Sequence, residues 1–165
     1  MIVSHASGYD SDHVITGLAG KKGFSVITIE KDMMNAEVGF GRKVLESLED
    51  SEISFEHLPS GIDTMSVIVS TYQLEGHRER VLQAMTRRTK PDSLTVEDGL
   101  ALVAVVGRGM VKAKGTASRV FTALSNAGIN IKMIDQGSSE LNIVIGVDEH
   151  DFEHALNAIY NEFVK

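Results

Sequence analysis

The chain has 165 residues, of which 42% are hydrophobic and only 5% aromatic, and it contains neither tryptophan nor cysteine. Without cysteine it can form no disulfide framework, no thiolate metal site and no cysteine nucleophile. A net charge of −7 argues against nucleic acid or an anionic membrane as a partner, because both favour basic surfaces.

The N-terminal residues and the hydrophobic runs bear on the cellular compartment. Residues 1–10 have no basic n-region and no apolar h-region, so they do not read as a signal peptide. No apolar run approaches the ~18 residues that a membrane-spanning helix requires. We therefore expect a protein of the cytoplasm, in which residues 1–11 form a linker.

The first half of the chain is predicted to alternate strands and helices. Runs rich in β-branched and aromatic residues, bounded by turn signals, predict strands at residues 13–19, 24–30, 53–58, 63–70 and 93–97. Apolar residues at helical spacing predict helices at 39–50 and 74–88. The sequence Gly20-Lys21-Lys22-Gly23 predicts a turn between the first two strands. From residue 24 onwards the predicted order is βαββαβ.

The second half repeats most of this order. A fully apolar strand is predicted at residues 100–106, followed by a helix and by two strands at 129–134 and 140–147. A final helix follows these strands. The core positions expected of the two helices are Ala117, Val120, Phe121, Leu124, Phe152, Ala155, Leu156, Ile159 and Phe163. The sequence ends directly after the last helix, so the second half lacks a fourth strand.

Residues 26–69 and 102–145 align with each other without a gap at a constant offset of 76 residues. The matched positions are apolar residues and glycines, as in the pairs Val26/Leu102, Met34/Met110, Gly39/Gly115, Val44/Val120, Leu48/Leu124 and Val67/Ile143. Such a pattern indicates the duplication of a folding unit, and hence two copies of one small domain. Because domains of ~75 residues bury a modest share of their surface, we expect the copies to pack together and the chain to dimerise.

The missing strand of the second copy predicts how the two copies are connected. An unfinished sheet would expose an unpaired edge, which folded proteins usually cover. The strand at 13–19 has no place in the first copy, so we predict that it completes the second sheet. A first domain, residues 20–98, would then be inserted into a second domain made of residues 12–19 and 99–165. The alternative is that residues 13–19 extend the first sheet.

A duplicated βαββαβ unit of this length resembles the ACT domain, a ferredoxin-like α/β sandwich that binds amino acids. The match is most specific from Gly128 to Ile143, where GINIKMIDQGSSELNI is similar to the C-terminal ACT domain of aspartate kinases. Residues 24–31 and 53–61 resemble the first ACT domain of the same family. The resemblance covers residues 12–165. It implies an α+β fold of two ferredoxin-like βαββαβ ACT domains, the first inserted into the second.

The resemblance also implies a regulatory function without catalysis. In the aspartate kinase family a kinase domain precedes this region, so we expect either a regulatory fragment or a separately translated regulatory subunit. We expect it to bind lysine, with threonine as the alternative, and to mediate feedback inhibition in the biosynthesis of aspartate-family amino acids. The expected partners are this effector, the kinase catalytic domain and a second copy of the chain. No cofactor or metal is expected.

Two other motifs could indicate different chemistry. Gly107-Arg108-Gly109 joins a strand to a helix, as a dinucleotide-binding loop does, but the third glycine of that motif is missing. His150 and His154 lie at i, i+4 among acidic residues, a spacing at which two imidazoles can bind a divalent metal. We interpret the first motif as a plain connection and the second as a solvated helix face. The sequence contains no P-loop and no nucleophile elbow, so no catalytic residues are predicted.

The loop from Met33 to Gly39, between the first long strand and the first helix, is the candidate ligand site. The unpaired N–H groups at the start of the helix point into this loop and favour a carboxylate, and Gly39 lets a ligand approach the backbone. Glu56 and Asp63 lie on strands that are expected to neighbour the loop. Their carboxylates can accept hydrogen bonds from ammonium groups, and two of them fit lysine better than threonine.

The resemblance to lysine-sensitive members of the family implies a larger set of effector-binding residues. They are Met34, Asn35, Glu37, Val38, Gly39, Phe40, Gly41, Phe55, Glu56 and Asp63. Glu56 stands where an Asp is usual and Glu37 where a Ser can occur, which leaves the identity of the ligand open. The family also implies that residues 135–140 help the two ACT domains to meet. The alternative function is a structural dimerisation module without an effector, in which Glu56 and Asp63 are ordinary solvated residues.

Overall fold

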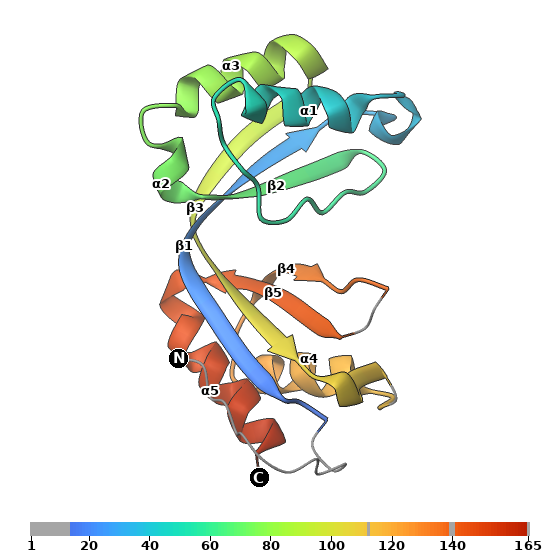
Figure 1. The fold of residues 1–165 in the computed structure, drawn as a ribbon, viewed down its shortest axis with the longest axis vertical. Coiled ribbons are helices and arrows are strands. Elements are labelled where there is room, and N and C mark those ends of the chain that lie inside the picture. The colour runs from blue at the N-terminus through green and yellow to red at the C-terminus, as the bar shows by residue number, and fades with distance from the viewer. Residues whose placement is uncertain (1–13, 112, 139–140, 165) are drawn as a thin grey trace. The chain divides into compact units, whose positions relative to one another are not determined.

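The computed structural model describes residues 14–111, 113–138 and 141–164 (Figure 1). The linker predicted at residues 1–11 lies outside them. The chain divides into two compact units. The inner unit is Gly23–Gly99, and the outer unit combines Met1–Lys22 with Leu100–Lys165, where inner and outer refer to position in the sequence. The identification of residues 20–98 as an ACT domain of their own stays a prediction.

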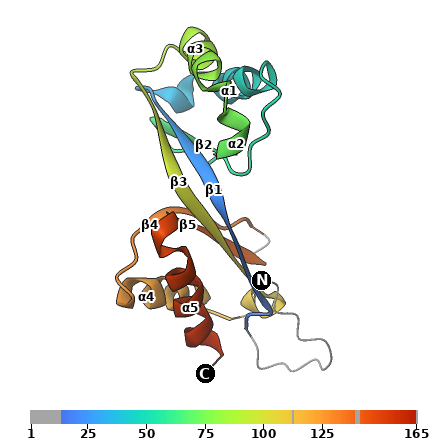
Figure 2. The same cartoon turned by 90° about the vertical axis from the view of Figure 1, so that its left-hand side faces the viewer.

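Five strands form a sheet with the order β2-β1-β3-β5-β4. β1 (Gly17–Glu30) and β3 (Ser93–Val106) are each 14 residues long, and each contributes to both units (Figures 1 and 2). Their neighbours, β2 on one side and β5 on the other, pair antiparallel with them. The strand order therefore gives the inner unit β2, β1 and β3, and the outer unit β1, β3, β5 and β4.

The turn predicted at Gly20–Gly23 is wrong, because β1 continues through it. Gly20 is a position of close packing, since a Cβ atom there would lie only 2.5 Å from Cε2 of Phe152. The strands predicted at 93–97 and 100–106 are likewise one strand, β3, which passes through Gly99 at a φ of 81°. Glycine is used for turns and for tight packing alike, so the sequence did not separate the two cases.

The inner unit packs two helices on one face of its strands (Figure 1). Besides β1 and β3, its elements are η1 (Met34–Ala36), α1 (Phe40–Glu49), β2 (Thr64–Ser70), α2 (Thr71–Leu74) and α3 (Arg78–Thr89). Ile27 pairs with Val67 in the register of β1 and β2, so alternate residues of both strands face the helices. The centre of this core consists of the fully buried side chains Ile27, Ile29, Val44, Leu48, Val67, Val69, Val81 and Met85.

Two predictions for the inner unit are corrected. The helix predicted at 74–88 is divided into α2 and α3, because Gly76 between them adopts a φ of 76° that no helix continues through. The strand predicted at 53–58 is an irregular segment, which touches β2 only through isolated bridges such as His57↔Ile68. Pro59 has no N–H to donate, so a regular ladder could not continue through this segment.

The outer unit has the same plan. Besides β1 and β3, its elements are η2 (Arg108–Val111), α4 (Thr116–Asn126), β4 (Ile131–Asp135), β5 (Asn142–Asp148), η3 (Glu149–Asp151) and α5 (Phe152–Phe163). Residues 14–22 belong to this unit, and the backbone N–H of Thr16 donates to the carbonyl of Val106 at 2.8 Å. Its core is again aliphatic, with Val103, Val105, Val120, Leu124, Ile143, Ile145 and Val147 fully buried.

The 76-residue repeat is a structural repeat. Gly39 and Gly115 are the N-cap residues of α1 and α4, with φ angles of 82° and 85°. Val44 and Val120 are both fully buried one turn further on. Because equivalent residues adopt equivalent conformations, the two copies can be compared position by position.

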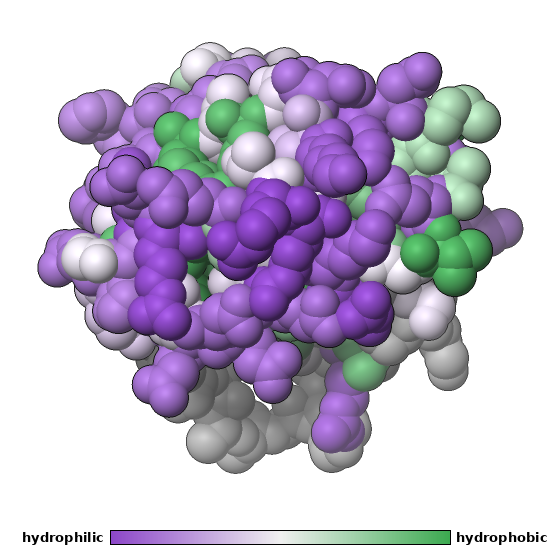
Figure 3. All heavy atoms as spheres, turned by 90° about the horizontal axis from the view of Figure 1, so that it is seen from above, coloured by the Kyte–Doolittle hydropathy of each residue, from purple (hydrophilic) through white to green (hydrophobic). Residues whose placement is uncertain are grey.

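The face seen in Figure 3 is dominated by hydrophilic side chains, with small apolar groups between them. Among the helices built from those residues, none is long and apolar enough to cross a membrane.

Candidate functional site

The loop that follows β1 in the inner unit is held rigidly by backbone hydrogen bonds. Met34 is buried and begins the 3-10 turn η1, while Met33 before it adopts a left-handed conformation with a φ of 58°. The N–H of Asn35 donates to the carbonyl of Ile62 at 3.0 Å. Asp63 fixes the loop twice, because its carbonyl accepts from the N–H of Lys31 and its carboxylate from the N–H of Met33, both at 2.9 Å. The candidate site therefore has a preformed backbone.

The start of α1 lies at the end of this loop. Gly39 is its N-cap residue, and no side chain caps the helix. The first N–H groups of a helix have no partner within the helix, and together with the helix dipole they favour an anion. Phe40 is buried beneath this end of the helix, whereas Val38 is 98% exposed beside it. The N–H of Phe40 donates to the carbonyl of Glu37 at 3.2 Å, so a carboxylate bound here would use the N–H groups of Gly41 and Arg42.

Glu37 lies between two ammonium groups. Its carboxylate forms ion pairs with Nζ of Lys31 and with Nζ of Lys43, the latter at 2.5 Å. All three side chains are half-buried. The hydrogen bonds from Lys31 and then from Lys43 lower the pKa of Glu37 from 4.5 to about 2, so the carboxylate is ionised throughout the physiological range. We call Lys31, Glu37 and Lys43 the Glu37 cluster.

Lys31 connects this cluster to the far end of α3. Its ammonium group donates to the carbonyl of Thr89 at 2.7 Å and lies 5.7 Å from the centre of the Phe40 ring. Thr89 is the last residue of α3, where carbonyl groups lack helical partners and a cation is favoured. Lys31 and Lys43 were not among the predicted site residues. Each lies six residues from Glu37, which is outside the i, i+3 and i, i+4 spacings that bring charged side chains together on a helix.

Phe55 and Glu56 lie elsewhere on the inner unit. The N–H of Glu56 donates to the carbonyl of Ile68 in β2 at 2.8 Å, and Ile68 lies five residues after Asp63, which directly precedes β2. At a rise of ~3.3 Å per residue, this places the backbone of Glu56 ~17 Å from Asp63. One chain therefore brings the Met33–Gly41 segment and Asp63 together, but not Phe55 and Glu56.

The outer unit carries the same loop without the charged cluster. At the offset of 76 residues, the positions of Lys31, Glu37 and Lys43 are occupied by Gly107, Ala113 and Arg119. A depression of about 330 Å³ lies there, lined by Met110, Ala113, Lys114, Gly115, Thr116, Ala117 and Gln136. Arg119 bonds to Glu162 at 2.9 Å, away from this loop. The carboxylate of Glu37 and the two lysines bound to it thus distinguish the inner site from its copy.

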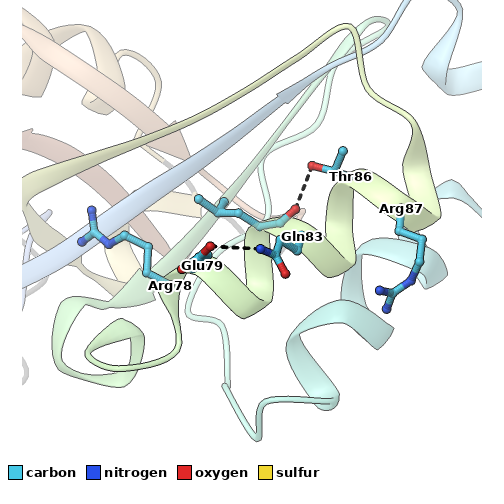
Figure 4. A pocket seen from close by; sticks show the side chains of 6 residues that line it. Arg78, Glu79, Gln83, Thr86 and Arg87 are labelled. Carbon is cyan, nitrogen blue, oxygen red and sulfur yellow. Dashed lines mark hydrogen bonds between the residues drawn. The ribbon is translucent and has the colours of Figure 1, made fainter.

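A larger depression, of about 670 Å³, lies on the outer face of α3 (Figure 4). Arg78 and Arg87 lie at its two ends, and none of the predicted effector-binding residues lines it. Its polar groups are already bonded along the helix, as Gln83 donates to Glu79 at 3.0 Å and Thr86 to the carbonyl of Leu82 at 2.8 Å. This is an open helix face with no convergent set of ligand-binding groups.

The alternative motifs are explained by packing and capping. Gly107 lies so close to the N-terminal segment that a Cβ atom would be 2.2 Å from the carbonyl oxygen of Val14. Asp148 accepts a hydrogen bond from the N–H of His150 at 2.9 Å and so caps the turn before α5. Within residues 14–111, 113–138 and 141–164, no group of three metal-binding side chains comes together.

Comparison with known proteins identifies relatives of this chain. Residues 103–163 match the family model of the ACT domain. The chain is 43% identical over 150 residues to Aspartokinase 3 of Bacillus subtilis, and this alignment covers 90% of the chain and 33% of that protein. The chain spans about a third of the length of the curated relatives that it matches first.

Solved structures give a consistent result. Aspartate kinase from Clostridium acetobutylicum matches with a TM-score of 0.88 at 50% identity, over 90% of this chain and 34% of that one. The regulatory subunit of aspartate kinase from Thermus flavus matches with a TM-score of 0.76 at 21% identity, over 91% and 99%. E. coli aspartokinase III in complex with lysine and aspartate matches with a TM-score of 0.73 at 24% identity, over 93% and 34%. These matches confirm the predicted α+β, ferredoxin-like ACT fold.

Proposed function

The chain is an ACT-domain region that matches the regulatory domains of aspartokinases, and on this premise we propose that it binds lysine as an allosteric effector. In the complete enzyme, a cytoplasmic kinase that phosphorylates aspartate with ATP, the bound effector would cause feedback inhibition of the catalytic domain. Threonine is the alternative effector. Both are end products of the pathway that aspartate phosphorylation would begin.

The preformed loop at the start of α1 is the observation that carries this proposal. The N–H of Phe40 donates to the carbonyl of Glu37 at 3.2 Å, and the N–H groups of Gly41 and Arg42 that follow it suit the α-carboxylate of an amino acid. Asp63 lies beside the loop and can accept a further hydrogen bond from an ammonium group. That E. coli aspartokinase III has been solved in complex with lysine and aspartate supports the choice of ligand.

A second copy of the chain would complete the site. Phe55 and Glu56 lie on the irregular segment beside β2, at the edge of the inner unit's strands. Edges of this kind can pair with an equivalent edge of another chain. We propose a homodimer in which the partner's edge segment approaches the loop, so that a carboxylate corresponding to Glu56 reaches the effector across the interface.

Feedback inhibition requires only a moderate binding free energy of the effector and a smaller coupling free energy. An effector affinity of ~0.1–1 mM corresponds to a binding free energy of ~4–5.5 kcal/mol. A coupling free energy of ~1–3 kcal/mol between effector and catalytic domain would change activity about 5–150-fold. The effector therefore needs to use only part of its binding energy for regulation.

Calorimetry and thermal unfolding of the chain test the proposal. With such an affinity, lysine at about 10 mM stabilises the folded state by ~1.4–2.7 kcal/mol, which raises Tm by about 3–10 °C. Asp63→Asn should weaken lysine binding. Asp92→Asn is the matched control, because Asp92 is another carboxylate of the inner unit that accepts a backbone N–H, that of Asp32 at 2.8 Å. Absence of heat and of a Tm shift with both lysine and threonine would contradict the proposal.

A structural dimerisation module is the second candidate function. The observation that favours it is the pairing of Glu37 with two lysines, because both oxygens of this carboxylate already accept a hydrogen bond. In that case the chain would dimerise in sedimentation experiments, Glu56→Ala would weaken the dimer, and no amino acid would change its melting temperature.

A further inference from the structure

The two lysines of the Glu37 cluster are held very differently. Lys31 has three partners: the carboxylate of Glu37, the carbonyl of Thr89 and the ring of Phe40. Among the described residues, the ammonium group of Lys43 has one partner, Glu37, and the Lys43 side chain is 33% exposed. Its backbone is fixed in the first turn of α1, where its N–H donates to the carbonyl of Gly39 at 3.1 Å. Lys31 is therefore a fixed part of the site, whereas the ammonium of Lys43 can leave Glu37 without breaking another bond.

The duplication provides an internal comparison. The framework of the loop is kept in both copies, since Met34 and Met110 are buried and Gly39 and Gly115 share one conformation. The three positions that form the cluster in the inner unit are occupied by Gly107, Ala113 and Arg119 in the outer copy, so the equivalent positions there hold neither a carboxylate nor a lysine. The outer copy forms the same loop without these charged residues. The Glu37 cluster is therefore not required for the loop to fold, and this indicates another role.

We propose that Lys43 is an internal occupant of an ammonium-binding position on Glu37, and that the side-chain ammonium of the effector replaces it there while Lys31 holds the carboxylate in place. This inference rests on the proposed function and assigns Lys43 as a specificity-determining residue. Its ammonium competes with the effector, so it sets the concentration at which the protein responds.

The chemistry of the exchange is balanced. Lys43 and a lysine effector both present a primary alkylammonium, so the same charge-assisted hydrogen bond to Glu37 is broken and formed again. The released Lys43 ammonium passes into water, where this compact cation is well hydrated. Simple addition is unfavourable, because three ammonium groups around one carboxylate would repel one another. The carboxylate is ready to accept, since its pKa of about 2 keeps it ionised.

Isothermal calorimetry on four forms of the full chain tests this inference. The forms are the parent protein, Lys43→Met, Lys43→Arg and Lys31→Met. Methionine keeps the length and helix propensity of lysine but removes the ammonium group. Lysine and norleucine are the ligands, because norleucine has the same carbon chain without the side-chain ammonium. Unfolding in urea shows that each variant is folded.

We expect Lys43→Met to bind lysine about two- to fivefold more tightly, as befits the loss of one partly exposed competing ion pair, and to bind norleucine unchanged. Lys43→Arg, which keeps a cation on Glu37, and Lys31→Met, which loses the support of the carboxylate, should show no gain. If Lys43→Met and Lys31→Met gained equally in affinity for lysine, the loss of one positive charge would explain the effect, and the inference would be overturned. An equal gain for norleucine would overturn it as well, because the side-chain ammonium would then play no part.

The proposed function and this inference fail in distinguishable ways. If no form of the chain binds lysine, the effector site itself is refuted and the inference falls with it. If the parent protein binds lysine but Lys43→Met binds it no more tightly, the effector site stands and only the competing role of Lys43 is refuted.

Discussion

Substitution of Gly107 by alanine tests whether the N-terminal segment is part of the outer unit. The added Cβ atom would lie 2.2 Å from the carbonyl oxygen of Val14 and 2.9 Å from Cα of Ile15. Both atoms belong to the backbone, so the steric clash can be removed only if the backbone around Val14 and Ile15 moves away from the end of β3. Overpacking of this kind costs ~1–3 kcal/mol, which lowers Tm by about 2–12 °C in a chain of this length.

Differential scanning calorimetry measures this change, and hydrogen exchange locates it. The amide of Thr16, which donates to the carbonyl of Val106, should lose protection in the Gly107→Ala variant. Gly17→Ala is the control in the same segment, because no atom lies within 4 Å of the Cβ that it would add. The control should be neutral or slightly stabilising. Unchanged melting and unchanged Thr16 protection in Gly107→Ala would refute the packing of this segment against Gly107.

Two further predictions concern charge and the repeat. The pKa of Glu37 is depressed by folding, so its ion pairs stabilise the protein above pH 4.5 and lose this effect as the pH falls towards about 2. In urea unfolding, the stability difference between the parent protein and Glu37→Gln should therefore be present at pH 7 and shrink at pH 3; a difference independent of pH would contradict it. Val44→Ala and Val120→Ala should each cost ~2–3 kcal/mol, since both residues are fully buried at equivalent positions, while Val164→Ala at a 58% exposed position should cost less than ~0.5 kcal/mol. A large difference between the two core variants would contradict equivalent packing of the copies.

Much of the fold could be predicted from the sequence, because the residues that face a core recur at the spacing of a helix or of a strand. The helix predicted at 39–50 is α1, at residues 40–49, and the repeat locates α4 at the same offset. The sequence failed where one residue type serves several purposes. Gly20 was interpreted as a turn residue, but it makes room for the Phe152 ring within a continuous strand. The alternation at 53–58 resembles a strand, yet the segment pairs only irregularly with β2.

The loop of the candidate site was predictable for a local reason: it joins a strand to a helix whose N-cap is a glycine with a φ of 82°. The charged cluster was not predictable, because its contacts are tertiary. The hydrogen bond from Lys31 to the carbonyl of Thr89 joins residues 58 positions apart, and no spacing rule covers such a distance. The placement of Glu56 was missed for a related reason, since it depends on which residue of β2 this irregular segment faces.

A crystal structure of the chain grown with lysine would show whether the inner loop holds the effector. We expect one lysine molecule in each inner unit, with its α-carboxylate against the N–H groups of Gly41 and Arg42 and its side-chain ammonium on the carboxylate of Glu37. Lysine bound only at the outer unit's loop around Gly115, or an inner loop that remains empty at saturating lysine, would refute this binding mode.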